Sequence, residues 1–250
     1  MLSKRDHIPD SLFECCYALV GVIIPSTIKT IGKKAFFKCK SITNVLIPEE
    51  CTLIDEYCFA SCSELKEINI PASVTRIGNS CFSGCAKLEK ITFNPFSKIT
   101  TIEPCTFYYC ASIKEIIFPS SVRVFDKKAL FNMSNLIVFK ALKPSSDEVQ
   151  DENKPSYIGE ECFAKCFKLK TIELPNSITY IEGCAFSECK SIEKISFLNC
   201  TKLKKIYTYA FYDEYNRKAN QSIKEIELPP SLEDFEFKRF IESFKKDLPP

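Results

Sequence analysis

The cysteines are the residues in this sequence whose type and spacing point first to chemistry. Three pairs are separated by three residues: Cys58/Cys62, Cys81/Cys85 and Cys162/Cys166. Thiolates one helical turn apart can bind zinc, and neighbouring thiols can also form disulfides. The chain has 15 cysteines in 250 residues but a single histidine, His7. Zinc binding and disulfide formation are therefore the two chemical interpretations to weigh.

Catalytic chemistry finds little support elsewhere in the sequence. His7 lies near the N-terminus, so a cysteine nucleophile would have no base beside it. We find no phosphate-binding glycine loop and no nucleophile elbow. We therefore predict that the protein is not an enzyme and needs no cofactor or metal. Lys and Arg total 34 against 32 acidic residues, a formal net charge of +2, which argues against nucleic-acid binding.

The cysteines follow an internal repeat. A phrase of the form Ala/Cys-Phe-x-x-Cys recurs along the chain, and we call its central apolar residue the anchor. Successive anchors are 23 or 25 residues apart, with one interval of 33. The nine anchors are Phe13, Phe36, Phe59, Phe82, Phe107, Leu130, Phe163, Phe186 and Phe211. Such a period is typical of solenoid proteins.

Most cysteines occupy fixed positions in this repeat. The third residue after the anchor is Cys or Met in eight of the nine units, and the residue before the anchor is often Ala or Cys. A position that accepts both Ala and Cys needs a small side chain, and Cys packs as a small polarizable hydrophobe. We therefore favour packing as the role of the cysteines. Disulfides and zinc remain the alternatives, although no histidine complements the spacing.

Each unit contains two segments with strand character. One is a short alternating run that ends at proline, such as Glu67 to Pro71, and the other resembles Val74 to Gly78. Alternation is typical of a half-buried strand, and proline ends the run because it cannot donate to a ladder. We expect the anchor phrase to form one helical turn. Stacked units would align their strands in parallel at about 4.8 Å, giving a rod or arc roughly 40 Å long.

The full repeat, x-x-L-x-x-I-x-I-P-x-x-V-T-x-I-G-x-x-A-F-x-x-C, resembles the BspA-like leucine-rich repeat, also called the Treponema pallidum type. The resemblance extends from Phe13 to about Phe235. It implies a leucine-rich-repeat right-handed superhelix. It also implies a non-catalytic protein-binding role of the surface-antigen or adhesin type, because the family occurs in bacterial and protozoan surface proteins associated with adhesion.

The domain organisation follows from the repeat and its interruptions. We predict a solenoid over residues 1–233, with a polar insertion near 142–155, and a C-terminal capping helix over 234–250. The helix is predicted because apolar residues recur on one helical face: Phe237, Phe240, Ile241, Phe244 and Leu248. A helix that docks a partner is the alternative. The exposed insertion could also contact a partner or remain a solvated loop.

The sequence has no recognisable export or membrane segment. Asp10 and Glu14 interrupt the apolar run that a signal peptide would need, and the apolar stretch from Cys15 to Ile24 is too short to span a bilayer. These features predict a cytoplasmic protein without membrane insertion. The family resemblance instead implies that display on a cell surface is possible.

The outward positions of the strands are the candidate partner contacts. The outward position two residues before Pro71 is Asn69, and the equivalent position of the other units is occupied by Ile23, Leu46, Thr92, Ile117 and Lys140. A short polar insertion adds Tyr212, Tyr215 and Arg217, which are residue types common at binding hot spots. The apolar Ile23 and Leu46 could instead be covered by an N-terminal cap. The partner is predicted to be a protein. The alternative function is a structural, self-associating intracellular scaffold, whose copies would join end to end or by their edges.

Overall fold

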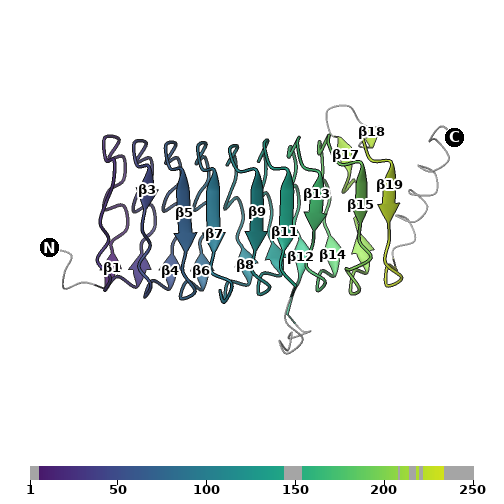
Figure 1. Cartoon of the computed structure of the whole chain (residues 1–250), viewed down its shortest axis with the longest axis horizontal. Coiled ribbons are helices and arrows are strands. Elements are labelled where there is room, and N and C mark those ends of the chain that lie inside the picture. The colour runs from purple at the N-terminus through teal and green to yellow at the C-terminus, as the bar shows by residue number, and fades with distance from the viewer. Residues whose placement is uncertain (1–5, 144–153, 208, 214–217, 220–221, 234–250) are drawn as a thin grey trace.

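The computed structural model describes residues 6–143, 154–207, 209–213, 218–219 and 222–233. Over these ranges the chain winds into a β-solenoid of about eight turns, and the units stand side by side along one axis (Figure 1). Each turn contributes short strands to two sides of the coil, which we call the long-strand side and the short-strand side. The described ranges contain no helix.

The long-strand side consists of parallel strands of two to four residues, divided into three sheets. The first sheet contains β3 (Asn44–Val45), β5 (Glu67–Ile70) and β7 (Lys90–Phe93). The second contains β9 (Glu115–Phe118), β11 (Val138–Ala141) and β13 (Thr171–Glu173). The third contains β15 (Lys194–Ser196) and β19 (Glu225–Glu227).

The short-strand side consists of two-residue parallel strands in two sheets. The first contains β1 (His7–Ile8), β2 (Thr30–Ile31), β4 (Leu53–Ile54) and β6 (Arg76–Ile77). The second contains β8 (Thr101–Ile102), β10 (Val124–Phe125), β12 (Tyr157–Ile158), β14 (Tyr180–Ile181) and β16 (Lys205–Ile206). An antiparallel hairpin, β17 (Tyr212–Asp213) and β18 (Lys218–Ala219), stands apart from both sides.

The core is a set of columns in which equivalent side chains of successive units pack on one another. The anchor column is the clearest: from Phe13 to Phe107, neighbouring ring centroids lie 5.1 to 5.7 Å apart and the rings are parallel within 15°. The column resumes between Phe163 and Phe211 with spacings of 5.1 and 5.3 Å. Stacked aromatic rings contribute about 0.5–1.5 kcal/mol per pair beyond the area they bury.

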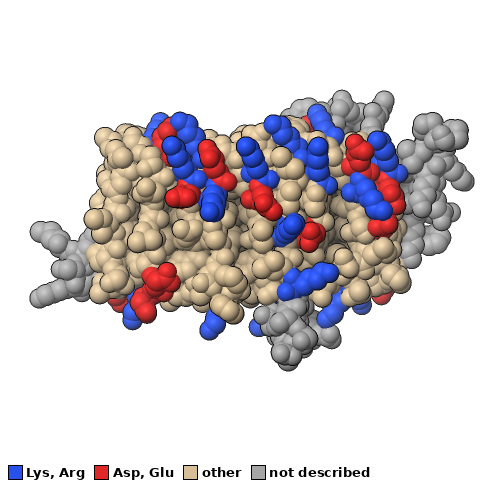
Figure 2. All heavy atoms as spheres, viewed as in Figure 1, with Lys and Arg blue, Asp and Glu red and all other residues tan. Residues whose placement is uncertain are grey.

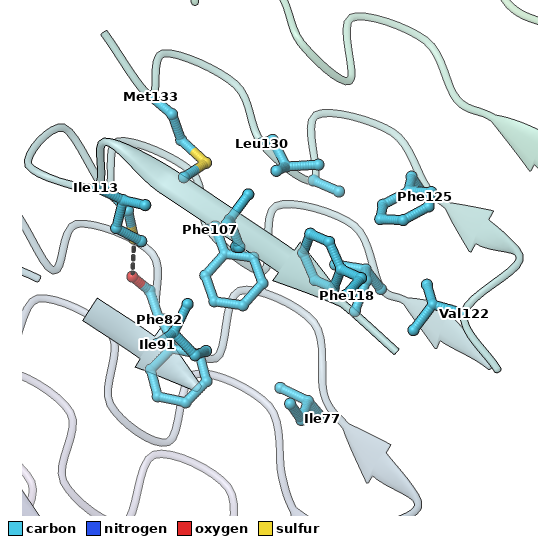
Figure 3. Close-up of a cluster of buried hydrophobic side chains, with 14 of the residues drawn as sticks. Ile77, Phe82, Ile91, Phe107, Ile113, Phe118, Val122, Phe125, Leu130 and Met133 are labelled. Atoms are coloured by element: carbon cyan, nitrogen blue, oxygen red, sulfur yellow. Dashed lines mark hydrogen bonds between the residues drawn. The ribbon is translucent and has the colours of Figure 1, made fainter. Parts of the chain in front are cut away.

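The column is interrupted at Leu130, and larger side chains in the same unit fill the space. Phe125 and Phe139 occupy positions where other units have isoleucine, and their ring centroids lie 5.2 Å apart. Phe139 also lies 4.8 Å from Phe163, edge to face. Figure 3 shows Leu130 and Phe125 of this layer together with Phe107. The core therefore keeps its volume while the residue at each position changes.

The predicted helical turn is wrong: the anchor phrase is a series of β-turns. The amide of Cys58 donates to the carbonyl of Asp55 within its own unit, whereas the amide of Phe59 donates to Cys81 in the next unit, at 3.2 and 2.9 Å. Tyr57 and Ser61 have positive φ values of 55° and 59°, which a right-handed helix excludes. Local and inter-unit bonds therefore alternate along the phrase. The predicted capping helix lies outside the described residues.

Most of the cysteines are core residues, as the packing interpretation predicts. All fifteen are free thiols and eleven of them are buried. In six units the thiol after the anchor donates to the anchor carbonyl of the preceding unit, as in Cys62 Sγ to Phe36 O at 3.2 Å and Cys85 Sγ to Phe59 O at 3.2 Å. That carbonyl also accepts a backbone amide, so the thiol uses its second lone pair.

Burial makes these thiols weak acids. It raises the pKa of Cys166 to about 12 and that of Cys39 to about 11. A thiolate is the form that binds metal and forms disulfides, so protonated buried thiols suit packing. Within the described ranges, no group of three or more His, Cys, Asp or Glu residues is arranged to hold a metal ion.

Candidate protein-binding surface

The outward residues of the long-strand side form a continuous row without charge over five units. We call Ile23, Leu46, Asn69, Thr92 and Ile117 the uncharged stripe. Ile23 is 93% exposed, Leu46 77% and Ile117 41%, so three large apolar side chains face solvent. Alternation positions them, because in β5 and β7 the neighbouring residues are buried and the stripe residues point outward. The described part of the N-terminus does not cover Ile23.

Charged side chains flank the stripe and replace it toward the C-terminus. Figure 2 shows the N-terminal end of this face, drawn at the left, without charge, and Lys and Glu gathered along the edge where the strands begin. In the last sheet Lys194 lies 2.9 Å from Glu225 and 2.8 Å from Glu227. The hydrogen bonds to Glu227 and Glu225 raise the pKa of Lys194. The charged side chains of this part of the face are therefore already paired with one another.

The structure brings together some of the predicted contact residues and separates others. Lys140 continues the stripe, but it is half-buried and lies 3.9 Å from Glu173 on the next strand. Tyr212 lies in the hairpin of β17 and β18, at the C-terminal part of the coil (Figure 1), with its ring 5.1 Å from that of Tyr209. Tyr215 and Arg217 lie outside the described residues. The stripe and the hairpin are thus two separate candidate surfaces.

A groove crosses the long-strand face between β7 and β9. It has a volume of about 880 Å³ and is lined by the stripe residues Thr92 and Ile117 together with eleven others: Glu89, Lys90, Ile91, Phe93, Pro95, Ser112, Lys114, Glu115, Pro119, Asn135 and Leu142. In the described chain, β7 pairs only with β5 and β9 only with β11. The groove therefore lies where the backbone ladder of the sheet is interrupted.

The same junction is closed on its other sides. On the short-strand side, where β6 and β8 also do not pair with each other, Arg76 binds Glu103 with Nε–Oε1 and Nη2–Oε2 distances of 2.7 and 3.2 Å. In the core, Phe82 stacks on Phe107 at 5.6 Å, and Cys110 Sγ donates to the Phe82 carbonyl at 3.1 Å. The two units are held together by these side chains and by backbone hydrogen bonds of the anchor phrase, such as Phe82 N to Thr106 O at 3.0 Å, although their strands do not pair.

The sequence analysis did not predict this groove, although the sequence contains a signal for it. The interval from Phe82 to Phe107 is 25 residues, and the two extra residues fall in the segment Asn94–Lys98 directly after β7. Phe93 and Phe118 occupy positions where the two preceding units have isoleucine, and their ring centroids lie 5.1 Å apart below the groove. The interruption therefore coincides with two extra residues after β7 and with larger side chains at this core position.

The arrangement of short parallel strands, inward Leu and Ile, and one residue register repeated in every turn defines a leucine-rich-repeat solenoid. The sequence also matches the profile of the BspA type leucine rich repeat region, with six copies over residues 6–137 and 138–246. The chain belongs to this family. Leucine-rich-repeat domains of this kind are generally non-catalytic scaffolds that bind proteins.

Solved structures with a similar fold include three from bacteria. A leucine-rich repeat protein of T. pallidum is 20% identical, covers 74% of this chain and 71% of its own, and has a TM-score of 0.49. A leucine-rich cell surface protein of Faecalibacterium prausnitzii is 23% identical, with coverages of 89% and 82% and a TM-score of 0.43. The pneumococcal vaccine antigen PcpA is 22% identical, with coverages of 85% and 66% and a TM-score of 0.43.

No curated protein matches the sequence. Among the described residues, no helix is long and apolar enough to cross a membrane.

Proposed function

We propose that the protein recognises another protein through the uncharged stripe of its long-strand face. The observation that carries the proposal is the exposure of Ile23 and Leu46, which lie in neighbouring units at the same outward position. Large apolar side chains grouped on a soluble surface mark sites of contact, because their burial in a complex is favourable. A solenoid also presents such a row as one extended surface.

The family relationship supports an adhesin-like or surface-antigen-like role for this recognition. In that role the partner is a protein of another cell or of the extracellular matrix. Self-association of the chain through the ends or edges of the solenoid is the alternative, and light scattering over a range of concentrations separates the two. A monomer at every concentration excludes self-association and leaves a foreign protein as the partner.

The test combines crosslinking with substitution. A photo-crosslinking residue at position 46 should capture the partner in the native cell, and mass spectrometry then identifies it. We expect the double substitution Ile23→Lys/Leu46→Lys to weaken binding of that purified partner by about tenfold or more, because two desolvated contacts become charged.

Leu198→Lys is the matched control. Leu198 is 50% exposed, apolar and outside the stripe, so its substitution should leave the affinity unchanged. Equal losses in the control and in the double variant, or no loss in either, would contradict the proposal. Thermal unfolding of each variant confirms that the fold is retained.

A further inference from the structure

We propose that the junction between the unit of Phe82 and the unit of Phe107 is a hinge, about which the two halves of the solenoid rotate relative to each other. We call the described residues from 6 to 93 the N-terminal half and those from 99 to 233 the C-terminal half. Rotation at the hinge changes the curvature of the long-strand face. The junction has three features that a hinge requires: missing ladders, an intact axis and adaptable contacts beside it.

Neither side of the coil has a backbone ladder across this junction. β6 does not pair with β8 and β7 does not pair with β9, whereas every other junction between described units keeps a parallel ladder on at least one side. At the preceding junction Glu89 N donates to Lys66 O at 2.8 Å, but in the described chain no equivalent bond joins Lys114 N to Glu89 O. Bending at this junction therefore breaks no ladder bond, whereas bending elsewhere distorts directional hydrogen bonds.

The anchor phrase keeps the two halves joined along one line. Phe82 N donates to Thr106 O at 3.0 Å. Gly84 N donates to Tyr108 O at 2.7 Å. The ring of Phe82 lies 5.6 Å from that of Phe107, and the two are parallel within 3°. Rotation about this line keeps these contacts and changes the separation of β7 from β9 and that of β6 from β8.

The other contacts across the junction are made by side chains that can adjust. Phe93 and Phe118 lie 5.1 Å apart with their rings tilted by 39°, and apolar contacts of this kind are not directional, so the rings can slide. On the short-strand side Arg76 Nε lies 2.7 Å from Glu103 Oε1, and both side chains are partly exposed. An ion pair in contact with water adds little stability. The pair therefore acts as a weak latch, which limits the rotation without preventing it.

The uncharged stripe crosses the hinge between Thr92 and Ile117, where the groove also lies. Rotation therefore changes the angle between Ile117 and the part of the stripe in the N-terminal half. A surface of adjustable curvature can fit partners of different shape, at the cost of ordering the hinge when a partner binds. This consequence rests on the proposed function, whereas the hinge itself does not.

Residual dipolar couplings of the full chain in a dilute aligned medium test the hinge. The two halves of a rigid solenoid give the same degree of order, whereas rotation on timescales up to milliseconds lowers the order of one half relative to the other. We expect the two values to differ by about 1.2-fold or more, as between a rigid and a flexible backbone. The internal control divides the C-terminal half between the units of Leu130 and Phe163, which ladders join on both sides, and should give equal values.

The variant Glu103→Gln tests the latch. It removes the charge that pairs with Arg76, so the difference in order between the two halves should increase. Glu64→Gln is the matched control, because Glu64 pairs with Lys87 at 2.8 Å across the preceding junction, where both strand sides have ladders. The control should leave the degrees of order unchanged. Thermal unfolding of both variants checks that the fold is retained.

Equal degrees of order in the two halves would overturn the hinge. An equally large difference across the control division would overturn it too, because the whole coil would then be flexible. An unchanged difference in Glu103→Gln would overturn the role of the ion pair as a latch. These measurements use the chain alone, so their failure leaves recognition through the stripe standing. Failure of Ile23→Lys/Leu46→Lys to weaken partner binding would instead sink the proposed function and leave the hinge.

Discussion

The anchor column between Phe13 and Phe107 and the layer around Leu130 solve the same packing problem in two ways. In the column, one phenylalanine per unit stacks in parallel on the next, and a thiol of each following unit binds the anchor carbonyl. In the unit of Leu130 the anchor is smaller than in the other units, and Phe125 and Phe139 are larger than the isoleucines at the equivalent positions. Met133 replaces the thiol donor. The column depends on repeated geometry, whereas the Leu130 layer depends on the total volume of several side chains.

Alkaline pH should give the largest difference between the two regions in their contribution to the free energy of unfolding. Burial raises the pKa of thiols such as Cys85, Cys166 and Cys189, whereas an unfolded thiol titrates near 8.5. The free energy of unfolding should therefore be constant below about pH 8 and fall above it, until the raised folded pKa is reached. Each thiol contributes up to about 1.4 kcal/mol per pH unit, so several together should unfold the protein.

Denaturant unfolding between pH 7 and pH 11 measures this slope. The variant Cys85→Ala should reduce it, because one titrating group is removed from the column. Met133→Ala destabilises the other region without removing a titrating group, so its slope should match that of the unchanged protein. A flat profile to pH 11 would show that the thiols are not held protonated by the fold.

Truncation of an anchor should cost more in the column than in the Leu130 layer. Phe82→Ala removes two stacked contacts, with Phe59 at 5.7 Å and Phe107 at 5.6 Å, and leaves a cavity. We expect a loss of about 4 kcal/mol in the free energy of unfolding, against about 3 kcal/mol for Leu130→Ala. Urea denaturation measures both, and an equal or greater loss at Leu130 would refute the distinction.

Extending the column through the interruption should destabilise the protein. Leu130→Phe adds volume beside Phe125 and Phe139 and should cost about 1–3 kcal/mol through overpacking. The double variant Leu130→Phe/Phe139→Ile restores the residue types of the other units and should recover part of this loss. Calorimetric melting temperatures of both variants test the expected loss and its partial recovery. A stabilised single variant would mean that the layer contains unfilled space.

The smallest effect is expected from a single thiol hydrogen bond. Cys85→Ala removes the bond to the Phe59 carbonyl and a small volume, and should cost about 1 kcal/mol or slightly more. Cys85→Ser keeps a donor and tests the bond separately from the volume. Met133→Leu, a swap of similar volume where no thiol bond exists, should cost less than about 1 kcal/mol. If Cys85→Ala is as mild as Met133→Leu, the thiol bonds contribute little.

The sequence predicts the solenoid well because its information is periodic. Phe59 and its equivalents recur every 23 residues, and the alternation in Glu67–Ile70 identifies the inward and outward side chains. The packing role of the cysteines follows from the exchange of Cys58 with alanine in other units. Each of these conclusions depends on several copies of one pattern, so single exceptions do not change it.

The errors arise where one pattern is compatible with two structures. An apolar spacing of three, as from Phe59 to Cys62, fits a helical turn and also two successive β-turns. The β-turns need positive φ at Tyr57 and Ser61, and neither residue type indicates it. Bonds to the next unit stabilise that conformation, and they exist only after stacking. The groove is similar, because the extra residues near Pro95 are visible in the sequence, but the loss of pairing between β7 and β9 is visible only in the folded chain.

The near-regular placement of buried thiols has a consequence for measuring motion in this protein. Cys39, Cys62, Cys85, Cys110, Cys166 and Cys189 sit in different turns and react with a thiol reagent only when their own turn opens. The reaction rate of each cysteine therefore reports the opening equilibrium of one turn, without any introduced label. The coil thus provides a set of built-in reporters along its axis, with a gap at Met133.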